Sequence, residues 1–200
     1  MRTQHCDCTA GQKDWGDVDD DTYDDIRALV AYDVEWVDED CDGPEDPVLT
    51  EETYDWYAQD IAHNIWYLGE DTVSYDHEGE CDNWVTNEET PEDGCRDGSF
   101  QAGVDGAEAG IVMLDSPFKG AFYSQEYYED EAEDWGKVLN FVPVSTEVFG
   151  EFENCLRTKE WTPLERGEVE HKYYCIGAGL VLIEELHGKT KWVELIDIDV

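Results

Sequence analysis

The chain has 200 residues, of which 52 are Asp or Glu and only 12 are Lys or Arg, so its formal net charge at pH 7 is −40. A charge this negative argues against binding nucleic acid through a basic surface and against docking on anionic lipid. Hydrophobic residues make up 40% and aromatic residues 12%, which is enough for a packed core and argues against wholesale disorder. No run of 18 apolar residues occurs, so no membrane span is expected.

The density of acidic residues indicates an environment rich in cations. A folded chain of this size exposes roughly 9,600 Å², which places neighbouring acids roughly 14 Å apart. The Debye length falls from about 8 Å at physiological salt to about 3 Å at 1 M, so salt weakens their repulsion. Adaptation to high salt or to divalent cations fits this composition. So does a surface that captures cations or a basic or self-associating protein partner.

Residues 1–25 contain eight Asp, including the run Asp19–Asp21, and few apolar residues. This composition predicts an acidic, weakly ordered N-terminal arm. Residues 26–200 then read as one antiparallel β domain.

Short segments rich in Val, Ile, Tyr and Trp recur along this domain and are separated by turn residues. In Leu49–Asp60, Tyr54, Trp56 and Ala58 fall on one face, whereas Thr53, Asp55, Tyr57 and Gln59 fall on the other. The expected strands are Ile26–Val37, Leu49–Asp60, Ile61–Leu68, Ile111–Leu114, Ala121–Tyr128, Val138–Val144, Phe152–Trp161, Val169–Ile176, Gly179–Leu186 and Thr190–Ile198. Only Glu129–Trp135 looks helical, over little more than a turn. The pattern predicts an all-β fold, with an antiparallel sheet that curves into a sandwich or a partly open barrel.

Two C-terminal hairpins can be aligned residue by residue. A turn at Pro163–Gly167 pairs positions whose numbers sum to 330, which sets Cys155 opposite Cys175 and Leu156 opposite Tyr174. It also sets Glu160 opposite Glu170, an unfavourable pair that we assign to a splayed hairpin end. We therefore expect a disulfide between Cys155 and Cys175, which lie within bonding distance in this register.

A two-residue turn at His187–Gly188 would make the last hairpin pair on a sum of 375. This register sets Ile183 opposite Trp192 and Glu184 opposite Lys191, an apolar pair and a pair of opposite charge.

Five strings follow one another along the chain: Glu51–Asp60 (EETYDWYAQD), Asn64–Asp71 (NIWYLGED), Ala102–Ala107 (AGVDGA), Thr158–Glu165 (TKEWTPLE) and Lys172–Tyr174 (KYY). Together and in this order they resemble a widespread group of uncharacterised bacterial secreted proteins and lipoproteins. The resemblance covers about residues 50–186 and implies an exported all-β protein with no assigned activity. Ile61–His63 departs from the Lys-Asp-Gly turn usual in such proteins.

Relative to those proteins, Cys81–Cys95 is an acidic insertion, and we expect a disulfide between these two cysteines to close it. Seven cysteines in all suit an oxidising compartment, so we expect an extracellular, cell-surface or periplasmic location. The partners of Cys6, Cys8 and Cys41 stay open.

Asp38-Glu39-Asp40-Cys41-Asp42-Gly43 has the order of a calcium-binding loop, in which alternate acids converge on one side of a turn. Asp38, Asp40, Asp42 and Gly43 are therefore the candidate metal site, with calcium as the ion. The match is incomplete, because Leu49 stands where a bidentate Glu is required, and an ordinary solvated turn is the alternative.

No nucleophile elbow, P-loop or dinucleotide-binding motif occurs in the sequence, and the five histidines show no metal-ligand spacing. We therefore expect a non-catalytic protein that binds cations or serves as a structural or interaction component. The alternative is a carbohydrate-binding or carbohydrate-acting protein. Its candidates are the aromatic residues Tyr54, Trp56, Trp66 and Tyr67 and the acidic pairs Asp55 with Asp60 and Glu70 with Asp71.

Overall fold

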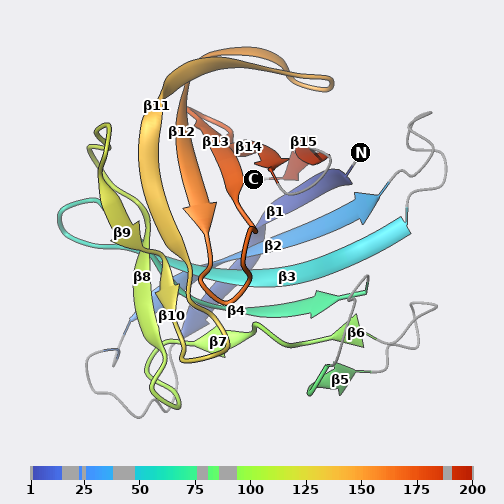
Figure 1. Cartoon of the computed structure of the whole chain (residues 1–200), viewed down its shortest axis with the longest axis vertical. Helices are drawn as coiled ribbons and strands as arrows, with labels where there is room; N and C mark the ends of the chain where they lie inside the picture. The colour runs from blue at the N-terminus through green and yellow to red at the C-terminus, as the bar shows by residue number, and fades with distance from the viewer. Residues whose placement is uncertain are drawn as a thin grey trace.

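A computed structural model describes residues 2–14, 23, 26–37, 48–75, 81–85, 94–186 and 191–199. Within these residues the fold is all-β, as the alternating patterns predicted, and consists of two antiparallel sheets that do not close into a barrel. Figure 1 shows that β2–β4 run across the molecule, whereas β11–β13 cross over them in a different direction. No helix in the described part of the chain is long and apolar enough to cross a membrane.

Most strands agree with the expected segments to within a few residues. Fifteen strands lie in the described residues: β1 Arg2–Asp14, β2 Arg27–Val37, β3 Val48–Gln59, β4 Ile65–Ser74, β5 Trp84–Val85, β6 Gly94–Cys95, β7 Phe100–Gln101, β8 Glu108–Met113, β9 Phe122–Ser124, β10 Glu126–Tyr127, β11 Trp135–Thr146, β12 Gly150–Trp161, β13 Glu170–Cys175, β14 Gly179–Glu185 and β15 Lys191–Asp199.

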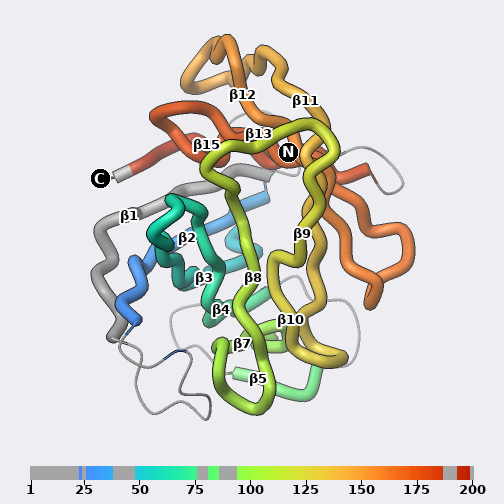
Figure 2. The backbone as a smooth tube through the Cα atoms, turned by 90° about the vertical axis from the view of Figure 1, so that its left-hand side faces the viewer, coloured from blue at the N-terminus to red at the C-terminus, as the bar shows by residue number. Residues whose placement is uncertain are grey.

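The first sheet has the order β8-β4-β3-β2-β1 and the second the order β15-β14-β13-β12-β11-β9. They are joined where β1 runs parallel to β15. At the other end the chain itself passes between the sheets, because β9 pairs with β11 whereas β10 pairs with β8. Figure 2 shows β8 and β9 side by side at this passage. The sheets therefore curl around a common interior.

The N-terminal region contains a strand that was not among the expected segments. Arg2–Asp14 forms β1, which pairs antiparallel with β2 and parallel with β15. Apart from Tyr23, the rest of the predicted arm lies outside the described residues, so the weakly ordered arm stays a prediction. Six of the eight Asp of residues 1–25 come after Asp14, so the composition of the whole segment does not represent its first half. Sheet pairing uses main-chain groups that every residue here supplies.

The hairpin of β12 and β13 has the predicted register. Leu156 lies opposite Tyr174, and Glu160 lies opposite Glu170. The expected disulfide joins Cys155 to Cys175, and a second joins Cys81 to Cys95. Both predicted pairings are thus confirmed.

The register predicted for the last hairpin is wrong by one residue. Ile183 lies opposite Val193 and Glu184 opposite Trp192, so the numbers sum to 376. Residues directly opposite each other share a face of the sheet, and a slip of one residue would turn every side chain of a strand over. Val181, Ile183, Val193 and Leu195 are all buried, which requires the even sum.

The segment Glu129–Trp135 is not a helix. Glu131 N donates to the Tyr128 carbonyl in a tight turn, Ala132 bridges back to Tyr128, and Trp135 begins β11. Glu and Ala favour helices, but a segment this short cannot repay the cost of nucleating one between two strands.

Residues 61–64 also differ from the expectation, because they form the turn between β3 and β4 instead of the start of a strand. Both oxygens of the Asp60 carboxylate accept hydrogen bonds within this hairpin, two from Asn64 and one each from Ala62 N and Trp66 Nε1, at 2.8–3.0 Å. These bonds, led by the one from Trp66, lower the pKa of Asp60 to about 2. His63 takes the positive φ of 68° that the turn needs and that glycine often supplies. Asp60 therefore organises a hairpin.

Candidate functional site

The curled sheets border a partly open cavity of about 830 Å³. In the described part of the chain, its walls carry nine acidic side chains and one basic side chain, that of Lys172. The acids are Asp33, Glu35, Glu51, Asp55, Glu70, Asp115, Glu126, Asp134 and Glu160. Apolar residues such as Val112, Met113 and Leu114 line another part. The interior of this protein is therefore a large, acidic and partly apolar chamber.

The alternation in β3 explains why polar groups face inward. Thr53, Asp55 and Tyr57, which the alternation placed together on one face of the strand, line the cavity. Trp56 and Ala58, on the opposite face, pack with the buried Leu68 in an apolar cluster outside the cavity. Because Tyr23, Ile26 and Ala102, which lie outside the strands, pack in the same cluster, β3 buries apolar side chains there and leaves its polar side for the chamber.

An irregularity in β4 brings two functional groups onto one face. Asp55 lies opposite Glu70 and Trp56 opposite Gly69, but Tyr57 lies opposite Tyr67, so β4 holds one extra residue. In a regular strand, residues 67 and 70 would face opposite sides, whereas a bulge between them turns both toward the cavity. Gly69 is required there, since its φ is +138° and a Cβ would stand 2.2 Å from the Phe100 carbonyl oxygen.

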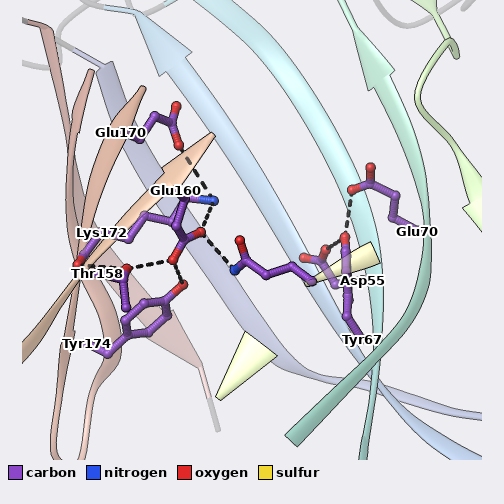
Figure 3. A network of polar contacts seen from close by, with 9 residues as sticks. Asp55, Tyr67, Glu70, Thr158, Glu160, Glu170, Lys172 and Tyr174 are labelled. Carbon is purple, nitrogen blue, oxygen red and sulfur yellow. Dashed lines mark hydrogen bonds and ion pairs between the residues drawn. The ribbon is translucent and has the colours of Figure 1, made fainter. Parts of the chain in front are cut away.

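The bulge creates a group of three side chains on the β3–β4 wall, Asp55, Tyr67 and Glu70, which we call the proton-sharing group. The Tyr67 hydroxyl oxygen lies 2.5 Å from Asp55 Oδ1 and 2.8 Å from Glu70 Oε2 (Figure 3). Burial raises the pKa of Asp55 to about 6 despite the hydrogen bond from Tyr67. Burial, reinforced by the charge of Asp55, raises the pKa of Glu70 to about 8. This wall therefore favours holding a proton near neutral pH.

The β12–β13 wall faces this group across the cavity (Figure 3). Glu160 is 4% exposed and accepts four bonds: from Thr158 at 2.6 Å, Tyr174 at 3.2 Å, Gln125 at 3.0 Å and Lys172 at 3.2 Å. Its oxygens are thus saturated with donors, which is what a buried carboxylate requires.

Lys172 also lies 3.6 Å from Glu170, so it stands between the two carboxylates that face each other in the register. Burial acts to lower the pKa of Lys172, but the charges of Glu160 and Glu170 outweigh it and raise the pKa well above the usual range. The assignment of the Glu160–Glu170 pair to a splayed hairpin end is therefore wrong: the pair is tolerated because one ammonium bridges it.

Two further acids share the chamber. Burial, and then the charge of Glu70, raises the pKa of Glu126 well above the usual range. Burial also raises the pKa of Asp134, although Lys172 opposes the shift. The lysine thus compensates its own wall, and the rest of the chamber carries an excess of acid.

Gln125 links the walls and leaves an acceptor unused. It is 5% exposed, lines the cavity and donates from Nε2 to Glu160, whereas Oε1 has no hydrogen-bond partner in the described part of the chain. The opposite amide orientation would place an oxygen against a carboxylate, so the observed one is required. A buried acceptor without a partner is costly, which makes it a contact point for a ligand that donates.

The predicted calcium residues Asp38, Asp40, Asp42 and Gly43 lie outside the described residues, so calcium binding there stays a prediction. Among the described residues, the side chains of Cys81, Cys95 and Asp97 form a closely spaced group of metal-ligand type, but the two sulfurs are bonded to each other. They therefore offer no thiolate to a metal ion.

The two acidic pairs considered for sugar chemistry are separated by the fold. Asp55 lines the cavity, but Asp60 belongs to the hairpin turn. Glu70 lines the cavity, but Asp71 pairs with Arg96 at 2.7 Å. The structure instead joins Asp55 with Glu70, a pair that the strand periodicity alone could not find because of the bulge.

The aromatic residues considered for sugar stacking are also dispersed. Trp56 and Trp66 pack against the outer apolar cluster, and Tyr54 stacks on Tyr32 at 4.7 Å. Only Tyr67 lines the chamber, where it stacks with Tyr57 at 5.2 Å.

Sequence reasoning did not identify Gln125, Glu126, Asp134 or Lys172 as site residues. The available signal was the alternation of Thr158, Glu160, Lys172 and Tyr174 on one face of a hairpin whose register was correctly predicted. A polar face of a paired hairpin is by itself typical of a solvent-facing surface, so this signal identifies a cavity wall only when the opposite sheet is known. Gln125 and Glu126 carried no such signal, because the chain changes sheets between them.

Comparison with protein-family models, curated proteins and solved structures gives no match to this chain. The resemblance to secreted bacterial proteins stays a prediction.

Proposed function

We propose that this chain is a non-catalytic binding protein whose internal cavity takes a small organic cation. The observation that carries the proposal is the chamber of about 830 Å³ with nine acidic side chains and one lysine. A volume of this size is typical of small-molecule sites, which combine apolar walls with a few placed polar groups.

The arrangement favours an organic cation over a bare metal ion. The carboxylates are distributed over both walls, so they surround a volume, whereas calcium needs six to eight oxygens around one point. The stacked rings of Tyr57 and Tyr67 add faces that attract cations. Val112, Met113 and Leu114 offer contact to an alkyl portion.

Binding of butylammonium, followed by calorimetry and by chemical-shift changes, tests this proposal. We expect saturable binding that the double substitution Asp55→Asn with Glu70→Gln weakens at least tenfold. The matched control is Glu151→Gln with Glu153→Gln, which removes the same charge from exposed positions of β12. Equal weakening by both double variants would mean that the cation senses only net charge, and the cavity proposal would then be wrong.

We also propose that the acidic surface suits a secreted or cell-surface protein in a medium of high ionic strength or one rich in calcium. Two disulfides are compatible with an oxidising compartment. The melting temperature should rise as sodium chloride increases from low to molar concentration, because salt screens the repulsion among acids. A flat series would contradict the electrostatic argument.

Calcium binding at the loop of Asp38, Asp40 and Asp42 is tested separately by calorimetric titration. The double substitution Asp40→Asn with Asp42→Asn should reduce the calcium heat of the wild type. An unchanged isotherm would mean that this loop is an ordinary turn and does not bind calcium.

Carbohydrate binding is a second candidate, which one observation favours. Phe122 is 55% exposed and stacks with Trp135 at 4.9 Å and with Trp161 at 5.7 Å. Exposed stacked rings are a platform for a sugar face. Tryptophan fluorescence during titration with xylo- and cello-oligosaccharides should then change in the wild type and not in Phe122→Ala.

A further inference from the structure

Resting on the proposed function of the cavity, we infer that its ligand is a primary ammonium and that binding displaces a proton held by Asp55, Tyr67 and Glu70. The ligand and the proton would thus compete for one site. The inference rests on how many hydrogen atoms this group can share and on the kind of polar atoms around it.

Counting hydrogens shows that the group holds an acidic proton. Tyr67 has one hydroxyl hydrogen, but its oxygen lies within hydrogen-bond distance of both Asp55 Oδ1 and Glu70 Oε2. If both carboxyls were ionised, one of them would face the phenol oxygen without a hydrogen between them. A proton on Glu70 resolves this conflict: Glu70 donates to the Tyr67 oxygen, and Tyr67 donates to Asp55.

Among the described residues that line the cavity, Lys172 is the one basic side chain, and it lies on the opposite wall. The strands beside the group contribute Asp33 from β2, and Glu51 and Tyr57 from β3. Glu126 lies on β10, and Asp134 directly precedes β11.

From the opposite wall come Glu160, Glu170, Tyr174 and Lys172. The ammonium of Lys172 lies 3.2 Å from Glu160 and 3.6 Å from Glu170, so its charge is already engaged. The negative charge at the proton-sharing group must therefore be compensated by a proton or by a cationic ligand.

Hydrogen-bond acceptors predominate among the charged and unpartnered groups of the cavity. They are the carboxylate oxygens of its nine acids and Gln125 Oε1, which is buried and has no partner among the described residues. A primary ammonium offers three N–H donors and satisfies such acceptors, whereas a quaternary ammonium of equal charge offers none. This difference selects the primary ammonium.

The exchange conserves both protons and charge. Before binding, the group carries one carboxylate and one protonated carboxyl. When the ammonium enters, the Glu70 O–H bond breaks, its proton passes to solvent, and both carboxylates accept from the ligand. No covalent bond to the ligand forms, and one positive charge replaces another.

Calorimetry with butylammonium at pH 7, in phosphate and in MOPS buffer, neither of which contains a primary ammonium, measures this exchange. Because the two buffers differ in their heats of protonation, the difference between the binding heats gives the number of protons released. We expect about one proton for the wild type and for the control Glu153→Gln, which removes an exposed acid outside the cavity. We expect release close to zero, with weaker binding, for Glu70→Gln. Tetramethylammonium should bind at least tenfold more weakly than butylammonium.

The outcomes separate the two proposals. Butylammonium binding without proton release would overturn the exchange and leave the cavity function standing. No binding of either cation would remove the cavity function itself. A third measurement needs no ligand: the side-chain carboxyl carbon resonance of Glu70 in the free protein should titrate well above the ordinary range of a glutamate. Titration within the ordinary range would overturn the exchange whatever the variants do.

Discussion

Each wall of the cavity sets two acidic residues directly opposite one another, and the two walls offset the resulting repulsion by different means. On the β12–β13 wall Glu160 faces Glu170, and Lys172 reaches both at 3.2 and 3.6 Å. On the β3–β4 wall Asp55 faces Glu70, and the Tyr67 hydroxyl lies within hydrogen-bond distance of both. The first wall is thus neutralised by a fixed cation and the second by an exchangeable proton.

Only one of these two walls can respond to a change in pH or to a ligand. A lysine bound to two carboxylates stays charged throughout the physiological pH range, so its wall is permanently compensated. A shared proton can leave when the pH rises or when another cation arrives. The responsive wall is therefore the one without lysine.

The largest effect should come from removing the fixed cation. Lys172→Met leaves Glu160 and Glu170 facing each other without compensation, and we expect the free energy of unfolding to fall by about 3–5 kcal/mol. Urea denaturation measures the loss. The control is Lys159→Met, whose ammonium lies over Trp161 at 4.8 Å and is worth about 0.5–1 kcal/mol. Equal losses in the two variants would show that Lys172 does not compensate the wall.

The second effect concerns the bulge that builds the other wall. Gly69→Ala forces a Cβ to within 2.2 Å of the Phe100 carbonyl oxygen at a φ of +138°, so we expect a loss of about 3 kcal/mol in unfolding free energy. Gly98→Ala is the matched control, with a φ of +95° but nothing within 4 Å. Its loss should be about 1 kcal/mol, from the backbone conformation alone. If Gly69→Ala cost no more than Gly98→Ala, the close approach at the bulge would be wrong.

A smaller effect follows from removing the bridging hydroxyl. Tyr67→Phe takes the hydrogen-bond donor from Asp55, and hydrogen bonds to charged groups contribute about 1.5–3 kcal/mol. Thermal and urea denaturation should both show a loss in this range. Tyr54→Phe, at a residue that is 45% exposed on the outer face, should change stability by less than about 0.5 kcal/mol. An equal loss of stability in Tyr54→Phe and Tyr67→Phe would show that the hydroxyl of Tyr67 does not stabilise the fold through Asp55.

The smallest effect is the one with a distinctive pH dependence. The pKa of Asp55 is raised to about 6 and that of Glu70 to about 8, so the folded chain binds more protons than the unfolded chain between about pH 4 and pH 8. Stability should therefore fall as pH rises through this range and level off above about pH 8. Glu70→Gln should flatten the fall and raise the melting temperature at pH 8 by about 2–4 °C, the shift that 1 kcal/mol produces in a chain of this length.

The exposed substitution Glu153→Gln serves as the control for that pH series, since it removes one charge outside the cavity. It should shift the curve of melting temperature against pH uniformly, without changing its slope. A slope unchanged in Glu70→Gln would contradict the proposed proton sharing.

The sequence by itself determined the class of fold, most strands, both disulfides and the register of the β12–β13 hairpin. These features depend on local periodicity and on nearby pairs such as Cys155 with Cys175, which one turn brings together. It also separated the two faces of β3, because side chains alternate along any strand.

Only the tertiary structure decided which of those faces surrounds a cavity. Trp56 and Trp66 are of a residue type that is typical of a core, but they lie outside the chamber. Asp55, on the opposite face of β3, lines the chamber. The register of β14 and β15 was equally undetermined, since Leu180–Ile183 is apolar at every position and allows either face to be buried.

The proton-sharing group depends on a single extra residue in β4, which local periodicity cannot reveal. The lysine bridge lies within the β12–β13 hairpin, but only the curl of the sheets places it opposite Asp55 and Glu70. The chain thus specifies its acidity and its strands locally, whereas the meeting of Asp55, Glu70 and Lys172 in one chamber results from long-range packing.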